Sequence, residues 1–226
     1  MDDKKFIGMD QLTFKFPFTK KYYEHDFYVS SNNFSAFKLI EDWPNWPGKW
    51  LNIFGETGSG KTHLSKILER KIGKTKLINA ESVNNKIIDE LHNFDCLIVD
   101  EFKNNIDESV LYSIFNQSKQ VDNFVLFNSV FSMKNLSFSS GDLKSRVDSF
   151  IFIGIELPTD DLLKVIITKN FSEKQITINP KFIDFIINNI ERSYEKLFKF
   201  IKDIDDLSLS TGKSININLI KKVLKQ

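Results

Sequence analysis

The 226 residues of the chain are enough for one sizeable hydrophobic core and a small second domain. Lys and Arg total 31 against 30 Asp and Glu, and the formal net charge of +1 argues against a strongly basic nucleic-acid-binding surface. One cysteine excludes an internal disulfide framework, the three histidines lack metal-ligand spacing, and no apolar stretch is long enough to cross a bilayer. No apolar signal segment follows Met1–Lys5, so we expect a cytoplasmic protein without a membrane partner.

The first 24 residues are polar and aromatic without clear periodicity, and we expect them to form a short extended arm. Residues 25–157 then alternate short apolar runs with segments of helical periodicity, which predicts an α/β domain with a mostly parallel sheet covered on both faces. The expected strands are Trp50–Phe54, Lys76–Asn79, Cys96–Asp100, Phe124–Asn128 and Phe150–Ile155. The expected helices are Ser35–Asp42, Lys61–Ile72, Asn84–Leu91 and Glu108–Val121.

Pro158 interrupts this alternation, and the segments that follow it carry apolar residues at helical spacing without a strand pattern. We therefore expect residues 158–226 to form a small all-helical domain. Pro180 suits the first turn of a helix, and Gly212 suits the stop between two helices. The expected helices are Asp160–Asn170, Pro180–Asn189, Ser193–Leu207 and Ile217–Leu224.

The stretch Gly55–Thr62 reads GETGSGKT and matches the phosphate-loop pattern GxxxxGKT at every fixed position. It follows an apolar strand and opens a predicted helix, which is the structural context that this motif requires. Its glycines allow backbone N–H groups to surround a phosphate, and the helix N-terminus adds partial positive charge. The alternative is a glycine-rich turn without a ligand, which the strand–loop–helix context argues against.

We predict that this loop binds ATP or ADP together with Mg²⁺. Lys61 is expected to reach the β- and γ-phosphates, and the Thr62 hydroxyl is expected to bind the metal ion. The residues expected to bind the nucleotide here are Gly55, Glu56, Thr57, Gly58, Ser59, Gly60, Lys61, Thr62 and His63.

A second part of the site is expected where the apolar run after Phe94 ends in Asp100 and Glu101. In a parallel sheet, chemistry gathers at the carboxyl ends of the strands. Asp100 is expected to hold Mg²⁺ and Glu101 to polarise the attacking water, and the alternative is a strand that ends in solvated acids. At the end of the next predicted strand, Asn128 or Ser129 is expected to position water.

A nucleotide-binding α/β domain followed by a small helical domain resembles the AAA+ ATPases. The run Asp26–Asn33 resembles the segment ahead of the phosphate loop in the bacterial replication initiator DnaA, where this segment lies over the adenine. The resemblance implies that Phe27 and Val29 contact the base. Gly141–Arg146 is similar to the "D/R-L-x-S-R" segment of the same family.

The chain resembles the Hda family, the DnaA-related regulators that inactivate the initiator after replication begins. Two features carry this resemblance: the short arm, and a sequence that stops after the helical domain. That resemblance implies a role as an inhibitor of DNA replication with DnaA and the β sliding clamp of DNA polymerase III as partners. It further implies no direct sequence-specific DNA binding, and it allows for self-association. It leaves open whether ADP or ATP is the working ligand.

The arm carries Gln11-Leu12-Thr13-Phe14-Lys15-Phe16, which resembles the QLxLF-type peptide that bacterial proteins insert into the sliding clamp. Leu12, Phe14 and Phe16 would be apolar anchors, and Gln11 would set the register. Phe14 stands where an aliphatic residue is more usual. The alternative is that these aromatic side chains fold back on the parent domain.

Arg146 occupies the position of the arginine that projects from one AAA+ subunit into the nucleotide site of its neighbour. The resemblance implies that Arg146 acts in trans on ATP held by DnaA, because a guanidinium stabilises the charge that develops during phosphoryl transfer. The alternative is a structural or solvated arginine.

One departure from the family pattern concerns the helical domain, where Glu195 stands at the position of an arginine that contacts the phosphates in most AAA+ proteins. Arg192 or Lys196 would have to replace that contact from a different turn. We therefore expect tight nucleotide binding with slow intrinsic hydrolysis. Two other functions remain as alternatives: a self-contained ATPase such as a helicase loader similar to DnaC, and a truncated initiator that binds DNA directly.

Overall fold

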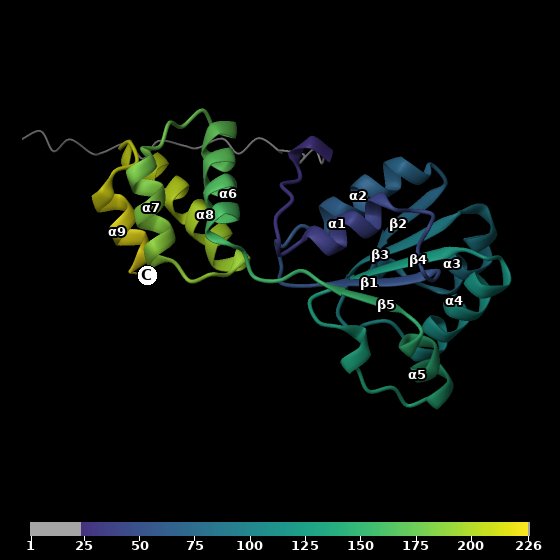
Figure 1. Ribbon diagram of the computed structural model, residues 1–226. Helices are drawn as coiled ribbons and strands as arrows, with labels where there is room; N and C mark the ends of the chain where they lie inside the picture. Colours follow the sequence, from purple (N-terminus) through teal and green to yellow (C-terminus); the bar gives the residue numbers. More distant parts are fainter. Residues whose placement is uncertain (1–23, 226) are drawn as a thin grey trace, which may run out of the picture. The chain divides into compact units, whose positions relative to one another are not determined.

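The computed structural model describes residues 24–225, and these divide into two compact units (Figure 1). An α/β unit comprises residues 24–162 together with 192–195. A helical unit comprises residues 163–191 and 196–225. The clamp-binding peptide predicted at Gln11–Phe16 lies outside the described residues. No helix of the described chain is both long enough and apolar enough to cross a membrane.

Among the described residues, one sheet of five parallel strands runs through the α/β unit in the order β2-β3-β4-β1-β5. The strands are β1 (Trp50–Phe54), β2 (Thr75–Asn79), β3 (Cys96–Phe102), β4 (Phe124–Ser129) and β5 (Ile151–Gly154). Because every strand points the same way, their carboxyl ends share one edge of the sheet. The predicted α/β class with a parallel sheet and a helical C-terminal region is confirmed.

Helices cover both faces of this sheet (Figure 1). One face packs against α1 (Phe34–Glu41) and α2 (Lys61–Ile72). The other packs against α3 (Asn85–Glu90), α4 (Glu108–Gln120) and α5 (Gly141–Asp148). Successive residues of β3 and β4 alternate between the two buried clusters, as the period of two in a strand requires.

The helical unit is built from the four segments that the sequence predicts as helices, two of them with the predicted bounds and two with different ends. They are α6 (Asp160–Glu173), α7 (Pro180–Asn189), α8 (Tyr194–Thr211) and α9 (Ile217–Leu224), of which α6 and α8 begin in the α/β unit. Pro180 stands in the first turn of α7, where the Asn179 side chain accepts a hydrogen bond from the Lys181 N–H. Gly212 follows α8 with a φ of 62°, a conformation that glycine adopts without strain.

Two features of the α/β unit differ from the sequence prediction. The segment Gly141–Asp148 forms α5, whereas the sequence predicted no helix there. β3 continues to Phe102, beyond the predicted end at Asp100, because the register with β4 shifts between Val99 and Phe102 and the chain pairs again after the bulge.

A buried asparagine in β1 ties the sheet to the chain that leaves β4. The Asn52 amide donates hydrogen bonds to the Phe127 carbonyl at 3.1 Å and to the Ser129 hydroxyl at 2.9 Å. Its oxygen accepts the Met133 N–H at 2.9 Å. The Asn52 side chain is fully buried, so each of these hydrogen bonds replaces one with water.

We expect Asn52→Ala to lower the free energy of unfolding by about 2–3 kcal/mol, because it leaves buried groups of β4 and of the following loop without partners. Chemical denaturation followed by circular dichroism measures the change. The exposed Asn85 in α3 offers a control: Asn85→Ala should change stability by less than about 0.5 kcal/mol. Equal effects of the two substitutions would contradict a structural role of the Asn52 network.

Candidate functional site

The phosphate loop connects β1 to α2 and has the backbone that its glycines permit. Gly58 and Gly60 have φ values of 88° and 101°, in the left-handed region. A side chain at Gly55 would bring its Cβ within 2.7 Å of the Ile155 carbonyl oxygen, so close approach of the backbone requires glycine there as well. No side chain caps the N-terminus of α2, which leaves this helix end suited to an anion.

The Lys61 side chain extends from the start of α2 back into the phosphate loop. Its ammonium group donates hydrogen bonds to the carbonyl oxygens of Gly55 at 2.7 Å and Glu56 at 2.8 Å. Burial lowers the pKa of Lys61, and the nearby carboxylates of Asp100, Glu101 and Glu56 oppose that shift. A phosphate at the loop would exchange these carbonyl contacts for a charged partner.

The Asp100 carboxylate is the centre of the site and is 7% exposed. One oxygen accepts the Thr62 hydroxyl at 2.8 Å, and the other accepts the Asn128 amide and the Glu101 N–H, both at 3.0 Å. The predicted metal-binding pair, Thr62 and Asp100, is therefore in direct contact. A hydroxyl and a carboxylate beside a phosphate loop form a donor set that Mg²⁺ accepts together with phosphate oxygens and water.

Asn128, at the end of β4, is fully buried and donates to the Ser65 hydroxyl at 2.7 Å as well as to Asp100. Its side-chain oxygen has no hydrogen-bond partner in the protein. A buried unpaired amide oxygen is unfavourable unless a ligand or water satisfies it. Of the two predicted candidates, Asn128 reaches the carboxylate, whereas Ser129 donates to the Phe131 carbonyl instead.

Glu101 lies in the bulge of β3 with a φ of 57°, an uncommon conformation for a residue other than glycine. Its carboxylate accepts a hydrogen bond of 2.7 Å from the amide of Asn79, at the end of β2. In the strand order, β2 lies on the opposite side of β3 from β1, which leads into the phosphate loop. Asn79 therefore holds the candidate base on the side away from that loop, and sequence reasoning did not identify it.

The predicted adenine segment lies against the loop. A side chain at Gly60 would meet the Phe27 ring at 2.9 Å, so Phe27 packs directly on the residue before α2. The Phe27 ring stacks on Phe37 at 5.7 Å and meets the His63 ring edge-on at 5.3 Å between centroids. Val29 is half-buried in the same segment. Phe27 and His63 thus form an aromatic surface next to the phosphate loop.

A further hydrogen-bonded group within the α/β unit involves the start of α8. The Glu56 side chain accepts the Tyr194 N–H at 2.9 Å, and the Tyr194 hydroxyl pairs with the Asn32 amide at 2.5 Å. Burial raises the pKa of Tyr194 to about 12. Through Glu56 and Asn32, this tyrosine connects the phosphate loop with the chain ahead of α1, and the sequence analysis did not identify it.

The three side chains considered for a phosphate contact at the start of α8 differ in their surroundings. Arg192 forms a two-pronged ion pair with Asp160, with nitrogen–oxygen distances of 3.0 Å. Lys196 lies 3.9 Å from the Glu191 carboxylate. Glu195 is exposed. Arg192 is thus already paired with a carboxylate, and this ion pair would have to break before Arg192 could contact a phosphate.

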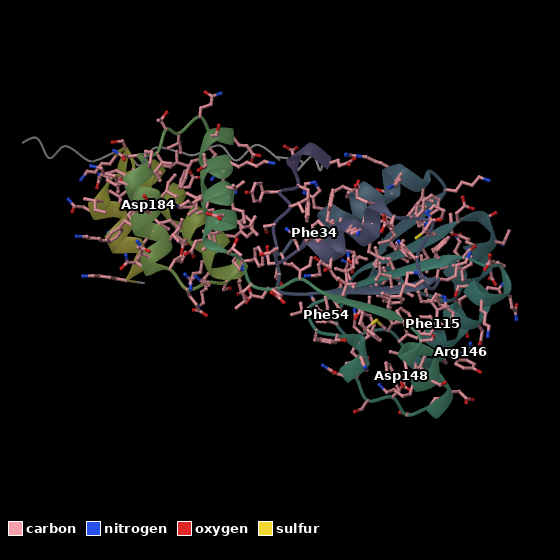
Figure 2. The ribbon with its side chains drawn as sticks, viewed as in Figure 1. Phe34, Phe54, Phe115, Arg146, Asp148 and Asp184 are labelled. Atoms are coloured by element: carbon pink, nitrogen blue, oxygen red, sulfur yellow. The ribbon has the colours of Figure 1, made fainter. Side chains whose placement is uncertain are left out.

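Arg146 lies far from the phosphate loop of its own chain. It lines a cleft of about 620 Å³ together with Trp50, the first residue of β1, whereas the loop follows Phe54, the last. About 13 Å of strand separates these two residues, at about 3.3 Å per residue. Figure 2 shows Phe54 and Arg146 well apart, and the Arg146 guanidinium lies 5.1 Å from the centre of the Tyr112 ring.

The fold and the loop together define the α/β unit as an AAA+ P-loop fold. Domain III of Thermotoga maritima DnaA superimposes with a TM-score of 0.74 at 19% identity, over 93% of this chain and 98% of that one. The AMPPCP-bound DnaA of Aquifex aeolicus gives 0.66 at 20% identity, over 83% and 66% of the two chains. A Thermotoga maritima RuvB variant gives 0.63 at 19% identity, over 84% and 67%.

Sequence comparison shows to which AAA+ proteins this chain is similar. The family model described as "Hda, lid domain" matches residues 160–224, and one described as "RNA helicase" matches residues 51–141. DnaA of Buchnera aphidicola is 27% identical over 92% of this chain and 53% of that protein. DnaA of Nitrosomonas europaea is 28% identical over 77% and 43%. The chain spans about half the length of the curated relatives it matches, and it is an AAA+ protein related to DnaA and Hda.

We expect Lys61→Ala to remove most of the thermal stabilisation that Mg-ADP gives the protein, because no other side chain donates an ammonium group from within the loop. For the wild type, ADP at about 100 times its Kd should add about 2.7 kcal/mol of stability. Differential scanning fluorimetry with and without nucleotide measures this. Lys66→Ala, on the same helix and paired with Glu69, should retain the full shift. Full stabilisation of the Lys61 variant would rule out the loop as the binding site.

We expect Asn79→Ala to raise the intrinsic rate of ATP hydrolysis about fivefold, since one hydrogen bond of about 1 kcal/mol no longer restrains Glu101. Single-turnover hydrolysis of labelled ATP is the measurement. In a Glu101→Gln background the same change should have no effect. Asn84→Ala removes a neighbouring cap that does not involve Glu101 and serves as the control. An unchanged rate in Asn79→Ala would show that this hydrogen bond does not limit hydrolysis.

Proposed function

We propose that this chain is a nucleotide-bound regulator of DNA replication initiation that accelerates the hydrolysis of ATP held by DnaA. The match to the Hda lid model and the identity to DnaA proteins support this class of regulator. The role in trans is supported by one observation above all: Arg146 lies near the start of β1, at the opposite end from the chain's own phosphate loop. A guanidinium so placed serves a nucleotide bound to another molecule.

In this proposal the chain's own nucleotide is a resident ligand with slow turnover. The loop, Asp100 and Thr62 provide the groups that hold ADP or ATP with Mg²⁺. Two features favour slow hydrolysis: Asn79 binds the carboxylate of Glu101, and Arg192 is paired with Asp160. When bound, Mg²⁺ would neutralise phosphate charge, while the protein supplies the loop and the buried Asp100–Asn128 pair.

The second partner in the proposal is the sliding clamp. The support is in the sequence alone: Gln11, Leu12, Phe14 and Phe16 lie outside the described residues. A peptide with apolar anchors suits a cleft on a partner, and it would bring Arg146 to DnaA molecules near the clamp.

The experiment that tests the function uses DnaA preloaded with labelled ATP and chased with excess unlabelled nucleotide, so that only that pool reports. Hydrolysis is followed with DNA-loaded clamp, with and without this protein and ADP. Acceleration that requires both the clamp and this chain is the expected result. No acceleration, after clamp and nucleotide binding have been verified, would overturn the proposal and favour the helicase-loader function. Leu12→Ala with Phe14→Ala should abolish the acceleration that the clamp supports.

We expect Arg146→Ala to lower the acceleration at least 100-fold, because an arginine finger contributes about 10³–10⁵ to the rate of phosphoryl transfer. Arg146→Lys should recover little of it, since an ammonium group lacks the planar fork. Lys144→Ala, on the same helix and paired with Asp148, should leave the acceleration unchanged. Normal acceleration by Arg146→Ala, with nucleotide binding intact, would exclude the finger role.

A further inference from the structure

Arg146 is held by a contact between two helices of the α/β unit. Its guanidinium carbon lies 5.1 Å from the centre of the Tyr112 ring, within the range of a cation–π interaction. The pKa of Tyr112 is lowered, because the Asn116 side chain and then the Arg146 guanidinium favour the charged form of its hydroxyl.

The backbones that carry this contact are anchored in the core. In α4, Leu111 and Phe115 flank Tyr112 and are fully buried. In α5, Leu143 and Val147 flank Arg146 and are fully buried in the same cluster. Because both helices rest on one packed surface, the distance between the Tyr112 ring and the start of the Arg146 side chain is fixed by packing.

The contact leaves the phosphate-binding part of the arginine available. A guanidinium carries five N–H donors along its edge, more than a contact with one aromatic ring occupies. A phosphate binds that edge in the forked geometry that suits arginine. The remaining side chains that line the cleft with Trp50, Tyr112 and Arg146 are Lys119, Asp142, Ser145 and Ser149.

We propose that Tyr112 is a positioning residue for Arg146, whose guanidinium it holds through the ring contact in the orientation that meets the phosphates of the neighbouring nucleotide. The role rests on the proposed function. A long arginine side chain loses rotamer freedom when it engages a ligand, and restraint before docking reduces that loss. Because an arginine finger engages the phosphates most strongly in the transition state, we expect this restraint to act on the maximal rate of the assembled complex.

The test measures acceleration of DnaA-bound ATP hydrolysis over a range of concentrations of this protein. Tyr112→Leu, which removes ring and hydroxyl, should lower the maximal rate about fivefold and leave the half-saturating concentration unchanged. Tyr112→Phe retains the ring and should retain most of the maximal rate. Ser113→Ala, which removes the adjacent hydroxyl of α4 from its bond to the Ser109 carbonyl, should match the wild type.

A double-mutant comparison separates positioning from direct contact with the partner. If Tyr112 acts through Arg146, Tyr112→Leu should have no added effect in an Arg146→Ala background. A normal maximal rate for Tyr112→Leu, or a raised half-saturating concentration, would overturn the positioning role while leaving the proposed function intact. Failure of the wild-type protein to accelerate hydrolysis would instead overturn the proposed function and this role with it.

The resting contact is measured separately, without DnaA. In protein with ¹³C-labelled tyrosine, the Tyr112 pKa is read from its ring-carbon shift, and Arg146→Gln should raise it because a nearby positive charge is lost. Thermal unfolding confirms that each variant is folded. An unchanged Tyr112 pKa in Arg146→Gln would show that the two side chains do not interact in solution and would overturn the proposal.

Discussion

The carboxylate of Asp100 joins three parts of the α/β unit at one buried point: the first turn of α2 through Thr62, the end of β4 through Asn128, and its own strand through the next N–H. A buried carboxylate is costly without partners, and the donors that satisfy it come from segments whose positions must therefore agree. Around this carboxylate lie the phosphate loop, the bulge that carries Glu101, and the unpaired side-chain oxygen of Asn128.

The parallel sheet gives this unit two ends with different chemistry. Its carboxyl edge carries the loop and the acidic cluster, whereas Arg146 and Tyr112 lie in a cleft that includes the first residue of β1. A strand of five residues is a rigid spacer between them. In the proposed function, this arrangement separates the surface that would hold a nucleotide from the one that would act on another molecule, and both are built on the same sheet.

Much of the fold and the central site could be predicted from the sequence because the signals are local. The phosphate loop is one continuous motif, and the apolar runs of β1, β3 and β4 match the observed strands within a few residues. The short α5 was missed because it buries only Leu143 and Val147, too few apolar positions for a helical pattern. Prediction also missed the pairs Asn79–Glu101 and Tyr112–Arg146, whose members lie far apart in the sequence and meet only after strands and helices have packed.

The left-handed backbone at Glu101 has a consequence for the balance between stability and chemistry in this protein. A residue with a Cβ is strained there by on the order of 1 kcal/mol, and glycine or asparagine would adopt the same φ more easily. Selection for stability alone would therefore favour replacing this glutamate. With glutamate at the bulge, the folded state is less stable by this amount of strain. Replacing Glu101 by glycine or asparagine would relieve the strain but would also remove the carboxylate.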